Sequence, residues 1–213
     1  MDQENKPGLD EIARAVMARR QGGRRLLVAI AAPPGAGKST LAAGLVARIN
    51  ADAGQDLAVV MPMDGFHLDN AVLDARGLLA RKGAPQTFDA AGFVALVRRL
   101  QHEDEVVIPH FDRGRDLSVA GAGVIGAAQR IVLVEGNYLL LRATPWDALA
   151  AMWDFSLWLD VPLPELESRL IRRWQDHGLA PEAARARALG NDIPNARLVI
   201  DGSRPADMVV VQT

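Results

Sequence analysis

Short apolar runs bounded by polar or turn-forming residues recur along the chain and predict buried strands. Leucine, isoleucine and valine dominate these runs, and each run is too short for a typical helix. The predicted strands are residues 26–31, 57–61, 106–108, 131–134, 155–159 and 209–211. The run at 131–134 contains no polar residue, which is the pattern of a strand buried on both faces of a parallel sheet.

Between these runs the apolar positions follow a helical period. Leu9, Ile12, Ala13 and Val16 recur at the spacing of one helix face before the first strand. Similar patterns predict helices at 41–50, at 164–177, and after Asp89, whose side chain is suited to cap a helix that runs through Leu100. Strands that alternate with helices predict an α/β fold, with a parallel sheet between layers of helices.

In such a sheet the ligand site lies beyond the carboxyl ends of the strands. Five positions stand at these predicted ends: Ala32, Asp64, Pro109, Glu135 and Asp160. We interpret Asp160 mainly as a strand-end residue. The functional site is therefore expected at this edge of the sheet.

The segment after the first strand has the sequence of a phosphate-binding loop. It reads Ala32-Pro33-Pro34-Gly35-Ala36-Gly37-Lys38-Ser39-Thr40, although the usual pattern begins with Gly. The two glycines allow the backbone N–H groups to turn inward, and the following helix adds the positive end of its dipole. Lys38 would reach the terminal phosphates of a nucleotide, and the Ser39 hydroxyl would ligate Mg²⁺. A solvated turn is the alternative, but the flanking strand and helix favour nucleotide binding.

Composition restricts the class of protein. The chain has 213 residues, of which 49% are hydrophobic and 23% charged, and this favours one domain over 1–213 with an insertion. A net charge of −2 argues against a nucleic-acid or membrane-surface binder and favours a small-molecule partner. Without cysteine there is no disulfide, thiolate nucleophile or Cys-ligated zinc. Residues 1–8 are polar, unlike a signal peptide, and no apolar run could span a bilayer, so we expect a cytoplasmic protein. The sequence leaves open whether the protein forms a homodimer.

Two acidic residues are candidates for the chemistry. Phosphoryl transfer to a hydroxyl needs a carboxylate near the acceptor and a metal ion on the phosphates. Asp64 follows the second strand and is the candidate for the first role, although an Asp before Gly is also common in turns. Glu135 ends the most apolar strand, where a buried acid needs a metal ion or a charged partner. We predict Glu135 and Ser39 as Mg²⁺ ligands, with a structural ion pair as the alternative for Glu135.

Arginines are concentrated on the helix predicted at 164–177. Arg169, Arg172 and Arg173 are spaced i, i+3 and i+4, so they share one face. They could close over a triphosphate as a lid and offset its charge. They could equally form a solvated face paired with the acidic residues of the same helix, and the spacing alone leaves both interpretations open.

Segments that follow two of the predicted strands supply candidates for an acceptor pocket. Besides Asp64, the candidates are Phe66, His67, His110, Phe111, Asp112, Arg113 and Arg115. A single His is more often structural than functional, and no His/Asp/Glu spacing indicates a permanent metal site. Mg²⁺ should therefore arrive with the nucleotide.

Three motifs together resemble those of the P-loop kinase group that contains uridine kinase, bacterial pantothenate kinase and phosphoribulokinase. They are the loop at 32–40, Met63-Asp64-Gly65-Phe66-His67, and Val132-Leu133-Val134-Glu135-Gly136-Asn137-Tyr138. The resemblance extends over nearly the whole chain, from the first strand to 206–210. Within the group the chain looks most like bacterial proteins described as fructose-transport-system kinases or nucleoside kinase-like proteins. These typically carry the segment seen here as Asn191-Asp192-Ile193-Pro194-Asn195.

The resemblance implies a P-loop NTPase three-layer fold, with a five-stranded parallel sheet, helices on both faces and a helical lid. It also implies ATP with Mg²⁺, Asp64 as the base, and Arg169 and Arg173 in lid helices at about 163–190, with an acceptor-site insertion at about 65–125. Uridine kinases have Pro-x-Tyr-Asp followed by a His. This chain has Pro109-His110-Phe111-Asp112 instead and lacks the downstream His.

The combined expectation is an ATP-dependent phosphotransferase that moves the γ-phosphoryl group to a hydroxyl of a small metabolite. A sugar such as fructose is one candidate acceptor, and a nucleoside or pantothenate-like compound is the alternative. A nucleotide-dependent switch protein is a further alternative. A GTPase switch would carry an Asn-Lys-x-Asp element, which the sequence does not contain.

Overall fold

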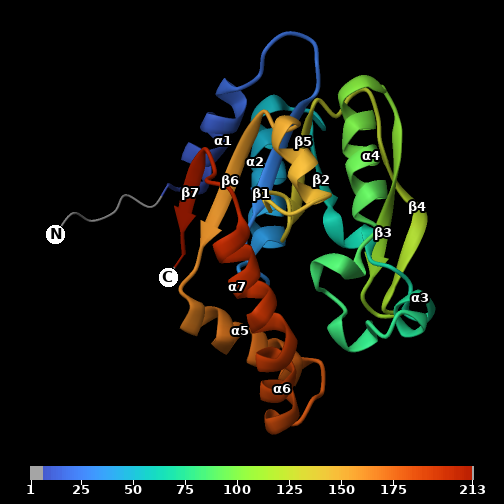
Figure 1. The fold of residues 1–213 in the computed structure, drawn as a ribbon. Coiled ribbons are helices and arrows are strands. Elements are labelled where there is room, and N and C mark those ends of the chain that lie inside the picture. Colours follow the sequence, from blue (N-terminus) through green and yellow to red (C-terminus); the bar gives the residue numbers. More distant parts are fainter. Residues whose placement is uncertain (1–6, 213) are drawn as a thin grey trace, which may run out of the picture.

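The computed structural model describes residues 7–212, and a five-stranded parallel sheet forms the centre of the molecule (Figure 1). The strand order is β2-β5-β1-β6-β7, and every neighbouring pair is parallel. The strands are β1 (Leu26–Ala31), β2 (Ala58–Pro62), β5 (Ile131–Gly136), β6 (Phe155–Asp160) and β7 (Met208–Val211). The predicted parallel sheet is confirmed, and all its carboxyl ends lie at one edge. Most of the polar N-terminal stretch, residues 1–6, lies outside the described part of the chain.

Helices cover both faces of this sheet. They are α1 (Leu9–Ala18), α2 (Lys38–Ala53), α3 (Asn70–Ala75), α4 (Ala90–His102), α5 (Leu163–Asp176), α6 (Pro181–Arg187) and α7 (Ile193–Gly202). Side chains of β1 alternate between two cores: Leu27 and Ala29 pack on the α4 side, whereas Val28 and Ile30 pack on the side of α1 and α2. The three-layer architecture is therefore confirmed. Figure 1 shows α5, α6 and α7 grouped below the sheet, beyond the ends of its strands.

Short irregular helices complete the chain. The 3₁₀ helices are η1 (Met63–Phe66), η2 (Leu79–Arg81), η3 (Pro85–Thr87) and η4 (Trp146–Ala151), and η5 (Ala188–Asp192) is a π-helix between α6 and α7. The predicted cap of α4 is present, since the Asp89 carboxylate accepts a hydrogen bond of 2.9 Å from the N–H of Gly92. The helix predicted at 41–50 is longer than expected and begins at Lys38.

One predicted strand does not join the sheet, which is a correction to the sequence analysis. Residues 106–108 belong to β3 (Val106–Asp112), which pairs antiparallel with β4 (Leu117–Ile125) in a separate two-stranded hairpin. Pro109 therefore does not end a strand of the sheet. The exposure of β3 explains the error: Val106 and Ile108 are buried, whereas Val107 is 46% exposed. Only one side of this strand packs against the core, and a run of three apolar residues is too short to reveal that.

A buried arginine joins the amino-terminal edge of the sheet to α4. Arg25 is only 5% exposed, and its guanidinium donates to backbone carbonyls at 2.8–3.0 Å. The acceptors are the carbonyl oxygens of Leu100, Glu103, Asp104, Gly126 and Gln129. Two of these carbonyls lie at the end of α4, where a cation also complements the helix dipole.

Replacing Arg25 by Met should lower the free energy of unfolding by about 3 kcal/mol, because it leaves several partly buried carbonyls without a donor. Urea unfolding followed by circular dichroism measures this change. Arg98→Met is the matched control, since Arg98 is exposed on α4. Equal stability of the two variants would contradict the role assigned to Arg25.

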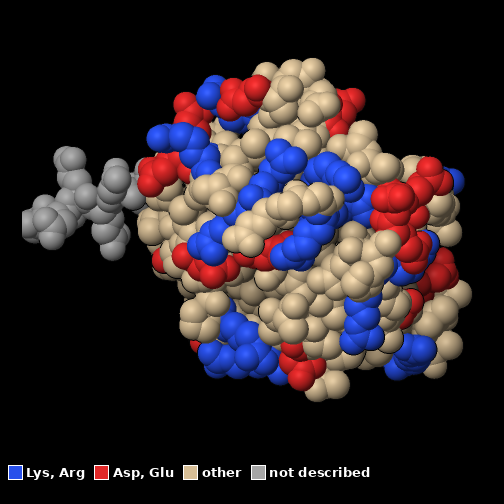
Figure 2. Space-filling view, turned by 90° about the horizontal axis from the view of Figure 1, so that it is seen from above, with Lys and Arg blue, Asp and Glu red and all other residues tan. Residues whose placement is uncertain are grey.

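The charges on the surface are mixed. Figure 2 shows Lys and Arg side chains interspersed with Asp and Glu on the face seen from above, in keeping with the net charge of −2. Within residues 7–212, no helix has the length and apolar character that crossing a membrane requires.

Candidate active site

The loop between β1 and α2 has a backbone suited to binding a polyphosphate. Gly35 and Gly37 have φ of +81° and +91°, in the left-handed region that side chains other than Gly rarely adopt. A Cβ at Gly35 would also lie 3.1 Å from the Leu170 side chain of α5. Because α2 begins directly after Gly37, its first N–H groups have no partner within the helix and lie beside the cleft that Gly37, Lys38 and Ser39 line.

Lys38 is held at the centre of this loop. Its side chain is buried, and its Nζ donates to the Pro33 carbonyl at 3.1 Å and to Asn137 Oδ1 at 2.6 Å. Burial lowers the pKa of the Lys38 ammonium, and the carboxylates of Glu135 and Asp64 oppose this shift. A buried ammonium bonded to neutral oxygens is well placed to bind an anion. Asn137 was not predicted as a site residue, although it belongs to one of the three motifs.

Ser39 and Glu135 form a second polar contact beside Lys38. The Ser39 hydroxyl donates to Glu135 Oε1 at 2.8 Å. Burial raises the pKa of the Glu135 carboxyl, and Lys38 acts in the opposite direction. A hydroxyl and a carboxylate are oxygen ligands of the kind that Mg²⁺ prefers, so Ser39 and Glu135 could hold a magnesium ion, which would neutralise phosphate charge.

Asp64 lies in η1, immediately after β2, and faces the same cleft. Its Oδ2 accepts a hydrogen bond of 2.8 Å from Arg113 Nη2, at the turn of the β3–β4 hairpin. The side chain of Asp64 is 28% exposed and that of Arg113 is 56% exposed. Solvent therefore weakens this ion pair, and a substrate hydroxyl could replace Arg113 as the partner of Asp64.

A close backbone contact fixes the turn that carries Asp64. A Cβ added at Gly65 would lie 2.8 Å from the carbonyl carbon of Pro109, closer than real Cβ atoms approach. Only glycine therefore allows η1 to pack against β3 in this way. The predicted strand at 106–108, which the sequence analysis assigned to the sheet, instead forms part of β3 and supports η1.

Gly65→Ala should therefore push η1 away from the hairpin, lower the free energy of unfolding by about 1–3 kcal/mol and reduce kcat by moving the neighbouring Asp64. Thermal unfolding and steady-state kinetics measure both effects. Gly23→Ala serves as control, because a Cβ at Gly23 meets no atom within 4 Å. If Gly65→Ala behaved like Gly23→Ala, the contact with Pro109 would not position Asp64.

Of the arginines predicted to form a lid, Arg173 lines the cleft. Enclosure by the cleft walls and the nearby guanidinium of Arg113 lower the pKa of Arg173. Lys38, Arg113 and Arg173 all line the cleft, so three cationic side chains face it. Arg169 instead donates to Glu165 Oε1 at 2.8 Å and lies outside the cleft lining.

The cleft has a volume of about 650 Å³ and is formed by segments far apart in the sequence. The phosphate-binding loop, η1, the residues around Lys82, the hairpin turn, α5 and the start of α7 all contribute. A larger cavity of about 850 Å³ lies elsewhere, between the start of α4 and the segment at 141–146, and is mainly apolar. It contains no residue of the phosphate-binding loop, so the smaller, polar cleft is the candidate active site.

The structure brings together most, but not all, of the predicted site residues. Those lining the cleft are Gly35, Gly37, Lys38, Ser39, Thr40, Asp64, His67, Phe111, Arg113, Glu135 and Arg173. Ala32 and Ala36 are loop residues whose side chains are buried in the core, and the Pro33 carbonyl accepts a hydrogen bond from Lys38. Phe66 packs in the core against Phe93.

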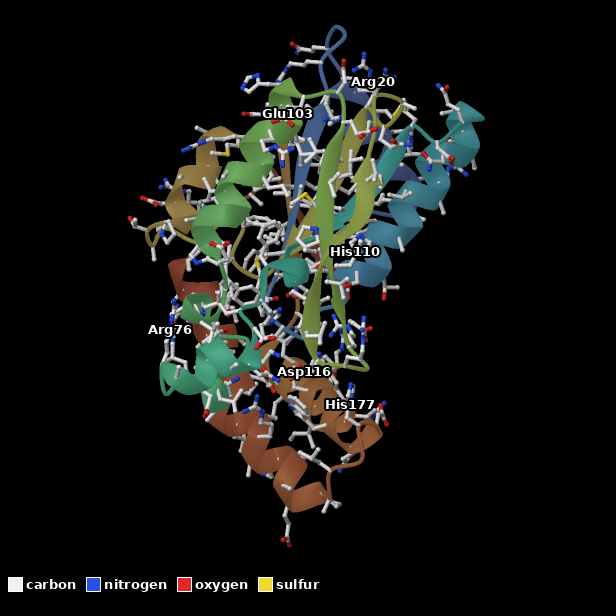
Figure 3. The ribbon with its side chains drawn as sticks, turned by 90° about the vertical axis from the view of Figure 1, so that its right-hand side faces the viewer. Arg20, Arg76, Glu103, His110, Asp116 and His177 are labelled. Carbon is white, nitrogen blue, oxygen red and sulfur yellow. The ribbon has the colours of Figure 1, made fainter. Side chains whose placement is uncertain are left out.

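Three hairpin residues predicted for the acceptor pocket lie outside the cleft lining. Asp112 and Arg115 pair with each other at 2.8 Å. His110 is exposed on β3, and Figure 3 shows it well above Asp116 along the hairpin, whereas Asp116 and His177 both lie at the cleft. The alternation of side chains along β3 and the position of the turn decide which of these residues reach the cleft.

The cleft also contains residues that sequence reasoning missed. They are Leu79, Lys82, Gly83, Asp116, Asn137, Trp174, His177, Arg187, Asp192 and Asn195. Lys82 Nζ contacts Asp116 Oδ2 at 2.9 Å and donates to the Asp116 carbonyl at 2.7 Å, and Asp116 has the unusual φ of +54°. For Asp192 and Asn195 a signal existed, namely the Asn-Asp-x-Pro-Asn segment. Asn137 also belongs to a recognisable motif, at 132–138, whereas the remaining residues carry no local pattern.

Comparison with known proteins identifies the family. No protein-family model matches the sequence. The chain is 32% identical over its whole length to a protein of Schizosaccharomyces pombe (strain 972) named "Putative uridine kinase C227.14", of which it covers 94%. The chain belongs to the P-loop kinases. It is a small-molecule kinase, and its α/β sheet is the P-loop NTPase fold.

Two further relatives of this P-loop kinase cover most of its length. It is 38% identical over 89% of its length to the uncharacterized protein YggC of Escherichia coli (strain K12), of which it covers 79%. The crystal structure of a "putative fructose transport system kinase" from Silicibacter sp. TM1040 superposes with a TM-score of 0.91. The two sequences are 48% identical, and the match covers 95% of this kinase and 98% of that protein.

Proposed function

We propose that this P-loop kinase transfers the γ-phosphoryl group of ATP to a hydroxyl of a small, hydroxyl-rich metabolite, with a sugar as the first candidate. The observation that carries the proposal is that Asp64 faces the same cleft as Lys38, Ser39 and Glu135. A carboxylate opposite a phosphate-binding loop is the arrangement needed to deliver a hydroxyl to the terminal phosphate.

Each residue has a distinct role in this proposal. Residues 32–40 surround the phosphates, and Lys38 neutralises the charge that develops on the transferred group. Ser39 and Glu135 hold Mg²⁺, which supplies further neutralisation of the phosphates when bound. Asp64 orients the acceptor hydroxyl and accepts its proton as the oxygen attacks phosphorus. The bond between that phosphorus and the bridging oxygen of ADP breaks in the same step.

The helices at about 163–190 act as a lid in this proposal, and the insertion at about 65–125 holds the acceptor. Arg173 already faces the cleft, and Arg169 would join it only after α5 moves. Closure of the lid excludes water, which would otherwise compete with the acceptor for the phosphoryl group.

A sugar is favoured by the polar character of the acceptor end of the cleft, where Lys82, Asp116 and Asp192 supply charged groups. The name of the Silicibacter protein mentions fructose transport, which makes fructose the first sugar to test. A nucleoside is the second candidate. It is favoured by the rings of Phe88 and Phe111, which lie 4.0 and 4.7 Å from the His67 ring and form an aromatic wall.

The proposal is tested by ADP release from Mg-ATP in the presence of fructose, other sugars, uridine or pantothenate, each compared with the rate without acceptor. We expect at least one hydroxyl compound to raise the rate and to appear as its phosphate ester by mass spectrometry. ATP binding without stimulation by any acceptor, together with acceleration by a protein partner, would instead indicate a nucleotide-dependent switch.

A further inference from the structure

The Asn191–Asn195 segment has no role in the chemistry described so far, yet its geometry is unusual. It spans the end of the π-helix η5 and the start of α7. Pro194 has no N–H to offer the carbonyl of Gly190, four residues earlier. That carbonyl instead accepts a hydrogen bond of 3.0 Å from Arg81 Nη1. Such π-helical turns inside a helix are frequent at functional sites.

This segment is fastened to the loop on the acceptor side of the cleft. Asn191 Nδ2 donates to the Lys82 carbonyl at 2.9 Å, and Arg187 Nη1 donates to the Ala80 carbonyl at 2.8 Å. These bonds join residues more than a hundred positions apart in the chain. The segment and the loop around Lys82 therefore form one continuous wall of the cleft.

Two side chains of this wall line the cleft and have donor or acceptor groups that form no hydrogen bond to the described residues. Asp192 and Asn195 are three residues apart, so they lie on the same side of the helix. Asp192 Oδ2 accepts from Trp174 Nε1 at 2.5 Å, and its other oxygen has no hydrogen bond to residues 7–212. Asn195 is only 3% exposed as a whole residue but lines the cleft, and no residue in the described part of the chain forms a hydrogen bond with its amide. An amide that lines a polar cleft and has no hydrogen bond to the protein is available to bind a ligand there.

These two side chains line the same cleft as the proposed base, Asp64. The Tyr138 hydroxyl donates to the Gly83 carbonyl at 2.5 Å. Burial raises the pKa of Tyr138, and the carboxylates of Asp192 and Asp64 both add to the increase. A ligand held by Asp192 and Asn195 would occupy the same cleft that Asp64 lines.

We propose that Asp192 and Asn195 are the specificity-determining residues for the acceptor and bind two adjacent hydroxyl groups of it. The free oxygen of Asp192 accepts from one hydroxyl, and the Asn195 amide pairs with the next. The acceptor is then a vicinal diol, either a sugar or the ribose of a nucleoside, and a third hydroxyl faces Asp64. This inference rests on the proposed kinase function, because it assumes that the acceptor occupies the cleft.

The test uses the full-length protein with Mg-ATP and fructose, ribose or uridine, each beside an analogue that lacks one hydroxyl. Asn195→Leu and Asp192→Asn should raise KM for the acceptor about 10–100-fold, with little change in KM for ATP. The wild type should discriminate against the deoxy analogue, and Asn195→Leu should lose that discrimination. Fructose or ribose as the better substrate identifies a sugar, and uridine identifies a nucleoside.

Two further variants show whether a change in KM comes from the proposed contacts or from a general effect on the helix. Arg197→Ala changes an exposed residue of the same helix and should leave both KM values unchanged. Asn195→Asp keeps the size and polarity of the side chain, so it carries the test if Asn195→Leu does not fold, as judged by thermal unfolding. We expect it to raise the acceptor KM as well, because a carboxylate cannot donate as the amide does.

The outcomes separate this inference from the proposed function. Turnover that Asp64→Asn abolishes, but that the Asp192 and Asn195 variants leave unchanged, would refute only the diol-binding role. A parallel rise in KM for ATP would refute it too, since the segment would then serve the nucleotide. Absence of stimulation by every acceptor in the wild type would overturn both.

Discussion

Replacing Asp64 by Asn is expected to lower kcat about 10²–10⁴-fold, while the affinity for ATP stays nearly intact. The amide keeps the shape of the side chain and its place in η1, but it cannot take up the proton of the acceptor hydroxyl. The phosphate-binding loop and the Ser39–Glu135 pair are untouched by the change. Acceptor-dependent ADP release gives kcat, and titration with a fluorescent ATP analogue gives the nucleotide affinity.

Asp160→Asn is the matched control for this experiment. Asp160 also ends a strand of the sheet at its carboxyl edge, but it is exposed and does not line the cleft. We expect its replacement to leave kcat unchanged. Unchanged turnover in Asp64→Asn would remove Asp64 from the mechanism, and an equal loss in both variants would indicate a general effect of charge at this edge.

Replacing Lys38 by Met is expected to reduce kcat/KM for ATP about 10³-fold, since the ammonium both binds the phosphates and neutralises charge in the transition state. Methionine fills much of the same space, so the buried position remains packed. The carbonyl of Pro33 and the amide of Asn137 lose their donor. Steady-state kinetics at varied ATP concentration measures the loss, and thermal unfolding shows that the variant is folded.

Arg48→Met provides the comparison for Lys38→Met. Arg48 lies on the same helix, α2, but is 43% exposed and pairs at the surface with Asp52. Surface pairs of this kind contribute little, so its kinetics should match the wild type. Wild-type kinetics in Lys38→Met would mean that the loop does not hold the phosphates through this lysine.

Much of the fold was predictable because its signals are local. The apolar runs at 26–31 and 131–134 become β1 and β5 at the centre of the sheet, where both faces are buried. The cap at Asp89 is also local, because its carboxylate accepts a hydrogen bond from the backbone N–H only three residues later. The hairpin β3–β4 was not predictable, because its second strand is rich in Gly and Ala and has no apolar alternation.

The candidate site was predictable in part for the same reason. The phosphate-binding loop has a recognisable motif, and the carboxylates after β2 and β5 directly follow or end apolar runs that predict strands. The sequence does not show which of Arg169 and Arg173 faces the cleft, because both fit the same helical spacing. Only the orientation of α5 relative to the cleft decides that Arg173 lines it and Arg169 does not. Lys82 lies in a segment with no recognisable pattern, and its partner Asp116 is 34 residues away.

The sequence by itself determined the parallel sheet, the phosphate-binding loop and the position of Asp64 after a strand. Glycine conformations, apolar periodicity and strand–helix alternation act over a few neighbouring residues, so they can be recognised without knowing the rest of the molecule. Only the tertiary structure decided that Arg113 meets Asp64 across 49 positions, and that Asp192 and Asn195 enter the same cleft. Those contacts depend on how whole elements pack against one another, which is a balance of burial and hydrogen bonding summed over the complete chain.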